Sequence, residues 1–109
     1  MKKIFKYAIP LENNVPIIVP AGARFLSLEC VKEIPVVYFV TDPAVQTMEK
    51  YYFKVFGTGW EISDEEWKEL DEHWWNLGVI QQAEGQLIWH VWMSDPDYNW
   101  RREHEETNN

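Results

Sequence analysis

Hydrophobic and polar positions alternate along most of this chain, and the pattern is clearest between residues 77 and 93. Two apolar runs there flank the short segment 83–86, which contains a glycine, and such a loop between β-prone runs predicts a hairpin. Strand side chains alternate between two faces. The second run therefore places Leu87, Trp89, Val91 and Met93 on one face, and Ile88, His90 and Trp92 on the other. Because both faces are largely apolar, we expect a central strand that is covered on both sides.

Five earlier segments also have the alternation or the β-branched and aromatic composition of strands. They span residues 2–9, 15–20, 24–32, 36–40 and 50–56. Pro16 and Pro20 bracket the second segment and cannot donate to a sheet ladder, so it is predicted to be a short edge strand. Glu33, Ile34 and Pro35 are expected to separate the third strand from the fourth, and the fourth should be buried on both faces.

The segment that follows residue 62 predicts an α-helix. Ser63 and Glu66 form a capping-box pattern, and the acids of the first turn suit the positive end of a helix dipole. We expect the helix to run from residue 64 to about 75. Spacings of three and four define an apolar stripe of Trp67, Leu70 and Trp74, and an acidic solvent side of Glu65, Glu66, Glu69 and Glu72.

These elements predict a mainly β (α+β) fold. We expect six or seven largely antiparallel strands in a small sandwich or open barrel, with one amphipathic helix inserted before the last hairpin. At 109 residues the chain is long enough for one hydrophobic core and too short for two domains. Residues 1–93 are predicted to form this single domain, and residues 94–109, which are polar and charged, a C-terminal tail.

Charge is unevenly distributed along the chain, whose net charge is −8. Residues 1–60 contain seven basic and five acidic side chains, whereas residues 61–109 contain three basic and thirteen acidic ones. The C-terminal part should therefore repel phosphate and attract basic surfaces, so direct binding to nucleic acid is not expected. No apolar run has the length of a signal peptide or a membrane span, so a cytoplasmic protein is expected. The single Cys30 cannot form an internal disulfide.

Known catalytic and cofactor patterns are not found in the sequence. The three histidines, His73, His90 and His104, have no metal-ligand spacing to one another or to Cys30, so no metal is expected. The Gly57-Thr58-Gly59 run lacks the third glycine of a phosphate loop, and no nucleophile accompanies the acidic helix. We expect neither enzymatic activity nor a cofactor. His90 has two interpretations: a structural histidine bonded to backbone, threonine or tyrosine, or a ligand contact.

Seven tryptophans exceed what a core of this size requires. Tryptophan is enriched in protein interfaces and also stacks on nucleobases. The adjacent pair Trp74 and Trp75 cannot both face the core from a helix, so one should be exposed or covered by a partner. The alternative is that all the tryptophans pack around the seam between helix and sheet or against the tail.

The order of several motifs resembles a small family of uncharacterised phage and prophage proteins. The motifs are K-K-I-F-K-Y at 2–7, V-P-A-G-A-R-F-L-S at 19–27, V-F-G-T-G at 55–59, L-G-V-I-Q-Q at 77–82 and L-I-W-H-V-W at 87–92. The resemblance covers residues 2–93 and implies a phage origin, but it carries no activity to this chain. The segment 60–76 and the tail after Met93 depart from the pattern, and they hold most of the negative charge.

The leading functional hypothesis is a non-catalytic, phage-type protein that inhibits a bacterial antiviral defence component, such as CRISPR-Cas or other nucleic-acid-binding machinery, in the host cytoplasm. Carboxylates of the helix would meet a basic surface of a host protein while tryptophans anchor the contact. The association with defence rests on the phage resemblance. The expected partner-binding residues are Trp60, Asp64, Glu65, Glu66, Trp67, Glu69, Glu72 and Trp75.

Two alternatives stay open. The first is a sponge for a nucleotide immune signal, in which bases stack on tryptophan or tyrosine and phosphates meet basic side chains. Its expected ligand-binding residues are Arg24, Lys50, Lys54 and His90. The second is a virion or assembly accessory protein. Neither alternative involves a membrane, and association into a homo-oligomer is compatible with all three hypotheses.

Overall fold

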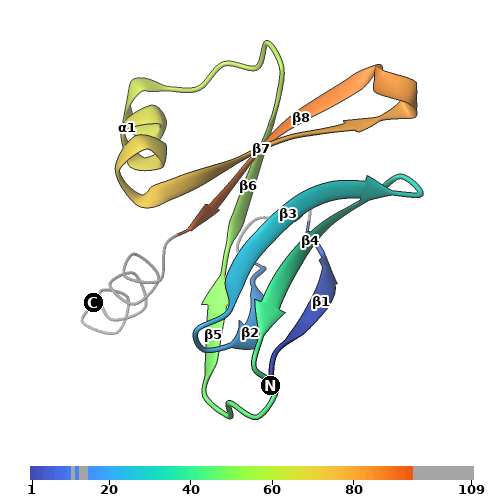
Figure 1. Ribbon diagram of the computed structural model, residues 1–109. Coiled ribbons are helices and arrows are strands. Elements are labelled where there is room, and N and C mark those ends of the chain that lie inside the picture. Colours follow the sequence, from blue (N-terminus) through green and yellow to red (C-terminus); the bar gives the residue numbers. More distant parts are fainter. Residues whose placement is uncertain (11, 13–14, 95–109) are drawn as a thin grey trace.

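The computed structural model describes residues 1–10, 12 and 15–94, which form a mainly β fold with a single α-helix before the last hairpin (Figure 1). The elements in chain order are β1 (Lys3–Ala8), β2 (Ile17–Pro20), β3 (Arg24–Val31), β4 (Ile34–Thr41), β5 (Met48–Tyr51), β6 (Phe53–Gly57), α1 (Asp64–His73), β7 (Trp74–Gln82), a 3-10 turn (Ala83–Gly85) and β8 (Leu87–Ser94). The predicted tail at 94–109 lies outside the described residues except for Ser94, which belongs to β8.

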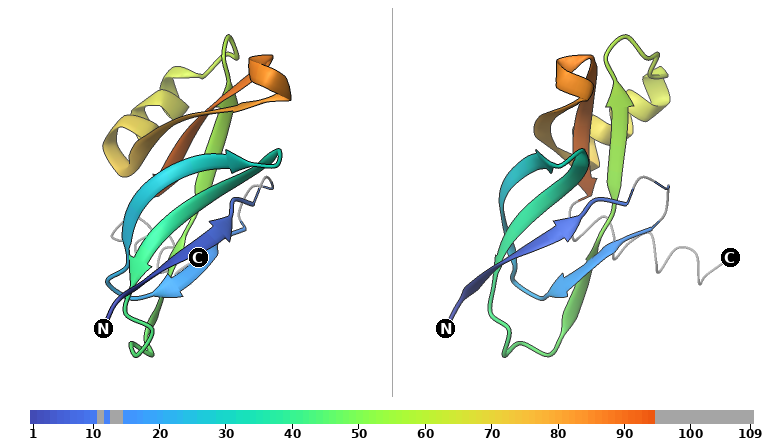
Figure 2. Two further views of the ribbon diagram at one scale, coloured as in Figure 1. Left: turned by 45° about the vertical axis from the view of Figure 1, so that its right-hand side comes forward. Right: turned by 90° about the vertical axis from the view of Figure 1, so that its right-hand side faces the viewer.

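The strands of the described residues form three antiparallel sheets with the orders β1-β4-β3, β2-β5 and β6-β8-β7. The sheets do not close into a barrel, and the predicted fold class is confirmed. As predicted, β2 is an edge strand and β8 is central in its sheet, with β6 on one side and β7 on the other. Figure 2 shows the β7–β8 hairpin lying beside the β3–β4 hairpin, and the turns at their ends are in contact.

The single strand predicted at 50–56 is two strands in the structure. β5 pairs with β2, β6 pairs with β8, and Tyr52 is the residue between them. The backbone N–H of Tyr52 donates to Ser94 Oγ at 2.9 Å, and the Ser94 N–H donates to the Tyr52 carbonyl at 2.9 Å. The chain therefore passes directly from one sheet to the next, which alternation along the sequence could not indicate.

The turn between β3 and β4 comes earlier than predicted. Lys32 and Glu33 form a two-residue turn with φ of 50° and 68°, conformations that lysine and glutamate rarely signal in a sequence. Pro35, expected to break the chain, is buried in β4 opposite Cys30, and its carbonyl accepts the N–H of Ile9 at 2.9 Å. This turn contacts the β7–β8 loop, because the Glu33 carboxylate accepts the N–H of Ala83 at 2.9 Å.

Phe39 lies at the centre of the core and is fully buried. Its ring meets Tyr7 and Phe25 edge to face and stacks on Tyr51 with centroids 5.7 Å apart. Burial raises the pKa of Tyr51 to about 12, and the Glu49 carboxylate, which accepts the Tyr51 hydroxyl at 3.2 Å, adds to the effect. The core joins all three sheets through Val19, Val37, Ile80, Val91 and Met93.

Strand β8 is covered less evenly than its apolar pattern predicted. Val91 and Met93 are buried in the core, but on the opposite face Trp92 and His90 are half-buried and Ile88 is exposed. The Trp92 ring meets Phe56 edge to face with centroids 5.6 Å apart. Part of this second face is therefore open to solvent.

Helix α1 begins as predicted, since Ser63 Oγ accepts the backbone N–H of Glu66 at 3.1 Å. It ends at His73, two residues before the predicted end. Trp74 and Trp75 instead begin β7, where they pair with Ser94 and Met93 of β8. Because neighbours on a strand point to opposite faces, Trp74 is buried and Trp75 is half exposed. The prediction that one of the two is exposed is confirmed, but the helical geometry assumed for it is wrong.

Candidate functional site

The side of helix α1 that faces the sheet carries acidic residues, contrary to the sequence pattern. Lys54 of β6 lies with Nζ 3.4 Å from Glu66 Oε1 and 3.8 Å from Glu69 Oε2. The same Nζ sits 4.8 Å from the centroid of the Trp74 ring. Glu66 and Glu69, predicted for the solvent side, are thus turned toward the sheet, and Leu70, four residues after Glu66, is fully buried.

The solvent side of α1 carries the other acids together with a tryptophan. Asp64, Glu65, Asp71 and Glu72 are exposed, and Trp67, expected in the apolar stripe, keeps 51% of its surface exposed. Asp64 precedes Trp67 by three residues and Asp71 follows it by four, spacings that make side chains neighbours on a helix. The helix therefore presents an indole between two carboxylates.

The other two tryptophans predicted for partner binding are also exposed, but they lie elsewhere. Trp75 is 49% exposed on β7, just after the helix. Trp60 is 58% exposed in the link between β6 and α1, where its ring meets Trp89 of β8 edge to face with centroids 5.4 Å apart. Trp60 thus belongs to a different surface feature from the outer face of α1.

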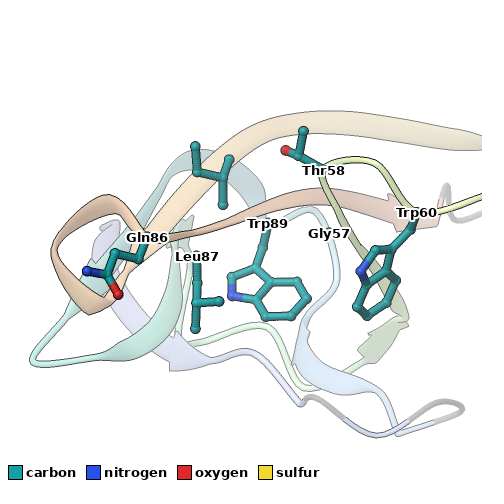
Figure 3. A pocket seen from close by; sticks show the side chains of 7 residues that line it. Gly57, Thr58, Trp60, Gln86, Leu87 and Trp89 are labelled. Atoms are coloured by element: carbon teal, nitrogen blue, oxygen red, sulfur yellow. The ribbon is translucent and has the colours of Figure 1, made fainter.

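Trp60 and Trp89 border a shallow hollow of about 190 Å³ at the end of β6 (Figure 3). Trp89 is held in place because its Nε1–H donates to Gln82 Oε1 at 2.8 Å. Sequence reasoning noted the surplus of tryptophans but not this pairing, which joins residues 29 positions apart. The hollow is lined by Gly57, Thr58, Trp60, Gln86, Leu87, Ile88 and Trp89.

The four residues predicted for ligand binding are spread over three sheets. Arg24 begins β3, Lys50 lies in β5, and Lys54 and His90 lie in β6 and β8. Lys54 is engaged by the helix carboxylates, and His90 Nε2 lies 2.8 Å from Thr58 Oγ1. This contact is compatible with the structural interpretation of His90, for which backbone, threonine and tyrosine were all possible partners.

Residues 1–101 match a domain of unknown function (DUF7352), and the chain belongs to this family. The match includes helix α1, so the acidic segment at 60–76 lies within the range that the family domain covers. No curated protein and no solved structure matches the chain. Within residues 1–10, 12 and 15–94, no helix is both long and apolar enough to cross a membrane.

Proposed function

We propose that this member of the DUF7352 family is a non-catalytic binding protein, and that the outer face of helix α1 engages a basic surface on a partner protein. The observation that carries the proposal is Trp67, half exposed between the carboxylates of Asp64 and Asp71. The indole ring of Trp67 is therefore accessible to a partner protein. Tryptophan is among the residues that dominate binding energy at protein interfaces.

The charges around Trp67 orient the partner protein and speed its association with the helix. The exposed acids of α1 outnumber its single lysine, Lys68, so the outer face carries negative charge. Such a patch steers encounter with a positive surface, while burial of the Trp67 ring at the interface slows dissociation. Each exposed carboxylate alone would contribute little, so the ring is the anchor and the acids select the partner.

The partner class that we propose is a nucleic-acid-binding component of bacterial antiviral defence. The resemblance of the sequence motifs to phage proteins supports this choice, and an acidic helix that occupies a basic groove would exclude the nucleic acid that normally binds there. In this setting the protein acts in the cytoplasm of the infected cell. Inhibition requires no chemistry, because occupancy of the groove is sufficient.

The test compares proteins retained from a bacterial lysate by the wild-type chain and by two variants. One is Trp67→Ala, and the other combines Asp64→Asn with Asp71→Asn, which removes charge without changing side-chain size. The matched control combines Glu12→Gln with Glu29→Gln, which removes the same charge from exposed positions outside the helix. Circular dichroism checks that each variant retains its fold.

We expect a set of nucleic-acid-binding proteins that the wild type and the control retain and that both helix variants lose. Equal retention by all four proteins would contradict the proposal. Calorimetry with cyclic nucleotides provides the second arm of the test. A submicromolar nucleotide affinity that survives the Asp64 and Asp71 changes would instead favour the sponge.

A further inference from the structure

The hollow beside Trp60 is a separate feature from the outer face of α1, and Gly57 is what allows it to form. A Cβ at position 57 would lie 2.7 Å from Trp60 Nε1 and 2.8 Å from Trp60 Cε2, closer than real Cβ atoms approach. The Trp60 ring thus occupies the space that any side chain at Gly57 would fill. Its edge-to-face contact with Trp89 then leaves the Trp60 ring largely open to solvent.

The size of the hollow limits what can enter it. At about 190 Å³ it is smaller than the roughly 300–1,000 Å³ pockets that enclose drug-sized ligands, and nucleotides are of that larger class. A single side chain of a partner is a better match. The lining combines two indoles and the aliphatic Leu87 and Ile88 with two oxygen-bearing groups, the Thr58 hydroxyl and the Gln86 amide.

The charge around the hollow disfavours an anion. None of its lining residues is charged, and the nearest charged residues along the chain are Glu61, beside Trp60, and Glu84, two residues before Gln86. Lys32 and Glu33 of the β3–β4 turn, which contacts the β7–β8 loop, add one charge of each sign. The sequence from 69 to 94 contains no lysine or arginine. A phosphate placed here would find no lysine or arginine in that segment, and the His90 ring there already has Nε2 2.8 Å from the Thr58 hydroxyl.

We propose that this hollow receives the side chain of an arginine from a partner protein, with the guanidinium group stacked on the Trp60 ring. Guanidinium is planar, weakly hydrated and attracted to the face of an indole, the best of the aromatic rings for this contact. The carboxylates of Glu61 and Glu84 favour a cation, and the oxygens of Thr58 and Gln86 are acceptors for its N–H donors. Arginine binding in this hollow does not depend on partner binding by the outer face of α1, so either proposal can be refuted without the other.

The test titrates the full chain with blocked Gly-X-Gly tripeptides, where X is arginine, lysine, citrulline or leucine, and with AMP. Indole N–H signals of the tryptophans are followed by NMR and assigned with single Trp→Phe variants. Citrulline keeps the shape of arginine but lacks its charge, so it isolates the contribution of the cation. We expect saturable shifts of the Trp60 and Trp89 signals with arginine, and an affinity for citrulline about tenfold lower, as a cation–π contact of this kind implies.

Variants locate the site and separate it from the helix. Gly57→Ala displaces the Trp60 ring without requiring an unusual backbone, because Gly57 does not have a positive φ. We expect Gly57→Ala and Trp60→Ala each to weaken the arginine titration at least about tenfold, the loss expected when the stacked ring is removed. Trp67→Ala is the matched control, since it removes a similarly exposed tryptophan of α1 and should leave the affinity within about twofold.

Several results would overturn the arginine site. Equal affinity for citrulline or leucine would show that charge is not recognised, and stronger binding of AMP would assign the hollow to nucleotides. Tighter binding of the lysine peptide would rule out guanidinium stacking. Absence of any saturable shift at Trp60 up to the solubility of the arginine peptide would remove the site altogether, while leaving the proposal for the outer face of α1 unaffected.

Discussion

Replacing Lys54 by methionine would remove a charge that links helix α1 to the sheet while keeping most of the unbranched stem of the side chain. The ammonium lies within ion-pair distance of Glu66 and Glu69 and above the Trp74 ring. Side-chain exposures of 24% for Lys54, 38% for Glu66 and 36% for Glu69 mean that water screens both pairs, so each contributes about 0.2–1 kcal/mol.

The contact of the ammonium with Trp74 adds about 0.5–1 kcal/mol, and methionine would recover part of the packing on that ring. We therefore expect Lys54→Met to lower the free energy of unfolding by about 1 kcal/mol. The corresponding fall in Tm is about 4 °C for a domain of this size. Urea unfolding followed by tryptophan fluorescence measures the difference, because Trp67 and Trp74 flank the helix contact.

Salt and a matched variant distinguish an ion pair from lost packing. The destabilisation should shrink in 1 M NaCl, where the Debye length is about 3 Å, and it should be smaller in a Glu66→Gln background. The control is Lys6→Met, an exposed strand lysine that makes no ion pair with the described residues. If Lys54→Met matched the wild type at low salt, or lost the same stability at both salt concentrations, the ion-pair assignment would be wrong.

Two further predictions concern the core. Leu70→Ala should lower the free energy of unfolding by about 2–5 kcal/mol, because a fully buried leucine is lost where α1 meets the sheet. Urea titrations measure this change, and Trp67→Ala should lower the free energy of unfolding much less. Tyr51, with its pKa raised from 10 to about 12, contributes stability that is fully present below pH 10 and is lost as pH rises through about 12, since the unfolded chain loses the proton first. Unfolding at alkaline pH should show this slope, Tyr51→Phe should flatten it, and an unchanged slope in that variant would refute the assignment.

Local patterns along the chain were sufficient to predict most of the strands and the start of the helix. Alternation located the last hairpin, and prolines identified β2 as an edge strand. Ser63 marked the first turn of α1 because a cap depends only on residues three positions apart. The end of α1 was misplaced, since Trp74 and Trp75 continue a helical pattern until pairing with β8 draws them into a strand.

The candidate sites were only partly visible in the sequence. Trp60, Trp67 and Trp75 were singled out, and the structure leaves each of them about half exposed. The sequence did not show which of these tryptophans share a surface, because Trp60 meets Trp89 only when β6 and β8 pair. Arg24 and Lys50, grouped with Lys54 by charge alone, lie in different sheets.

The sequence by itself determined the β-rich class, the position of the last hairpin and the acidic character of α1, because these depend on residue type and short-range spacing. Tertiary structure alone decided how α1 is rotated about its axis. Leu70 and Trp74 of the predicted apolar stripe are buried, but Lys54 of β6 pairs with Glu66 and Glu69 on the sheet side. Trp67, the third residue of the stripe, is left half exposed. The burial of each α1 side chain depends on contacts with the sheet, and spacing within the helix does not specify those contacts.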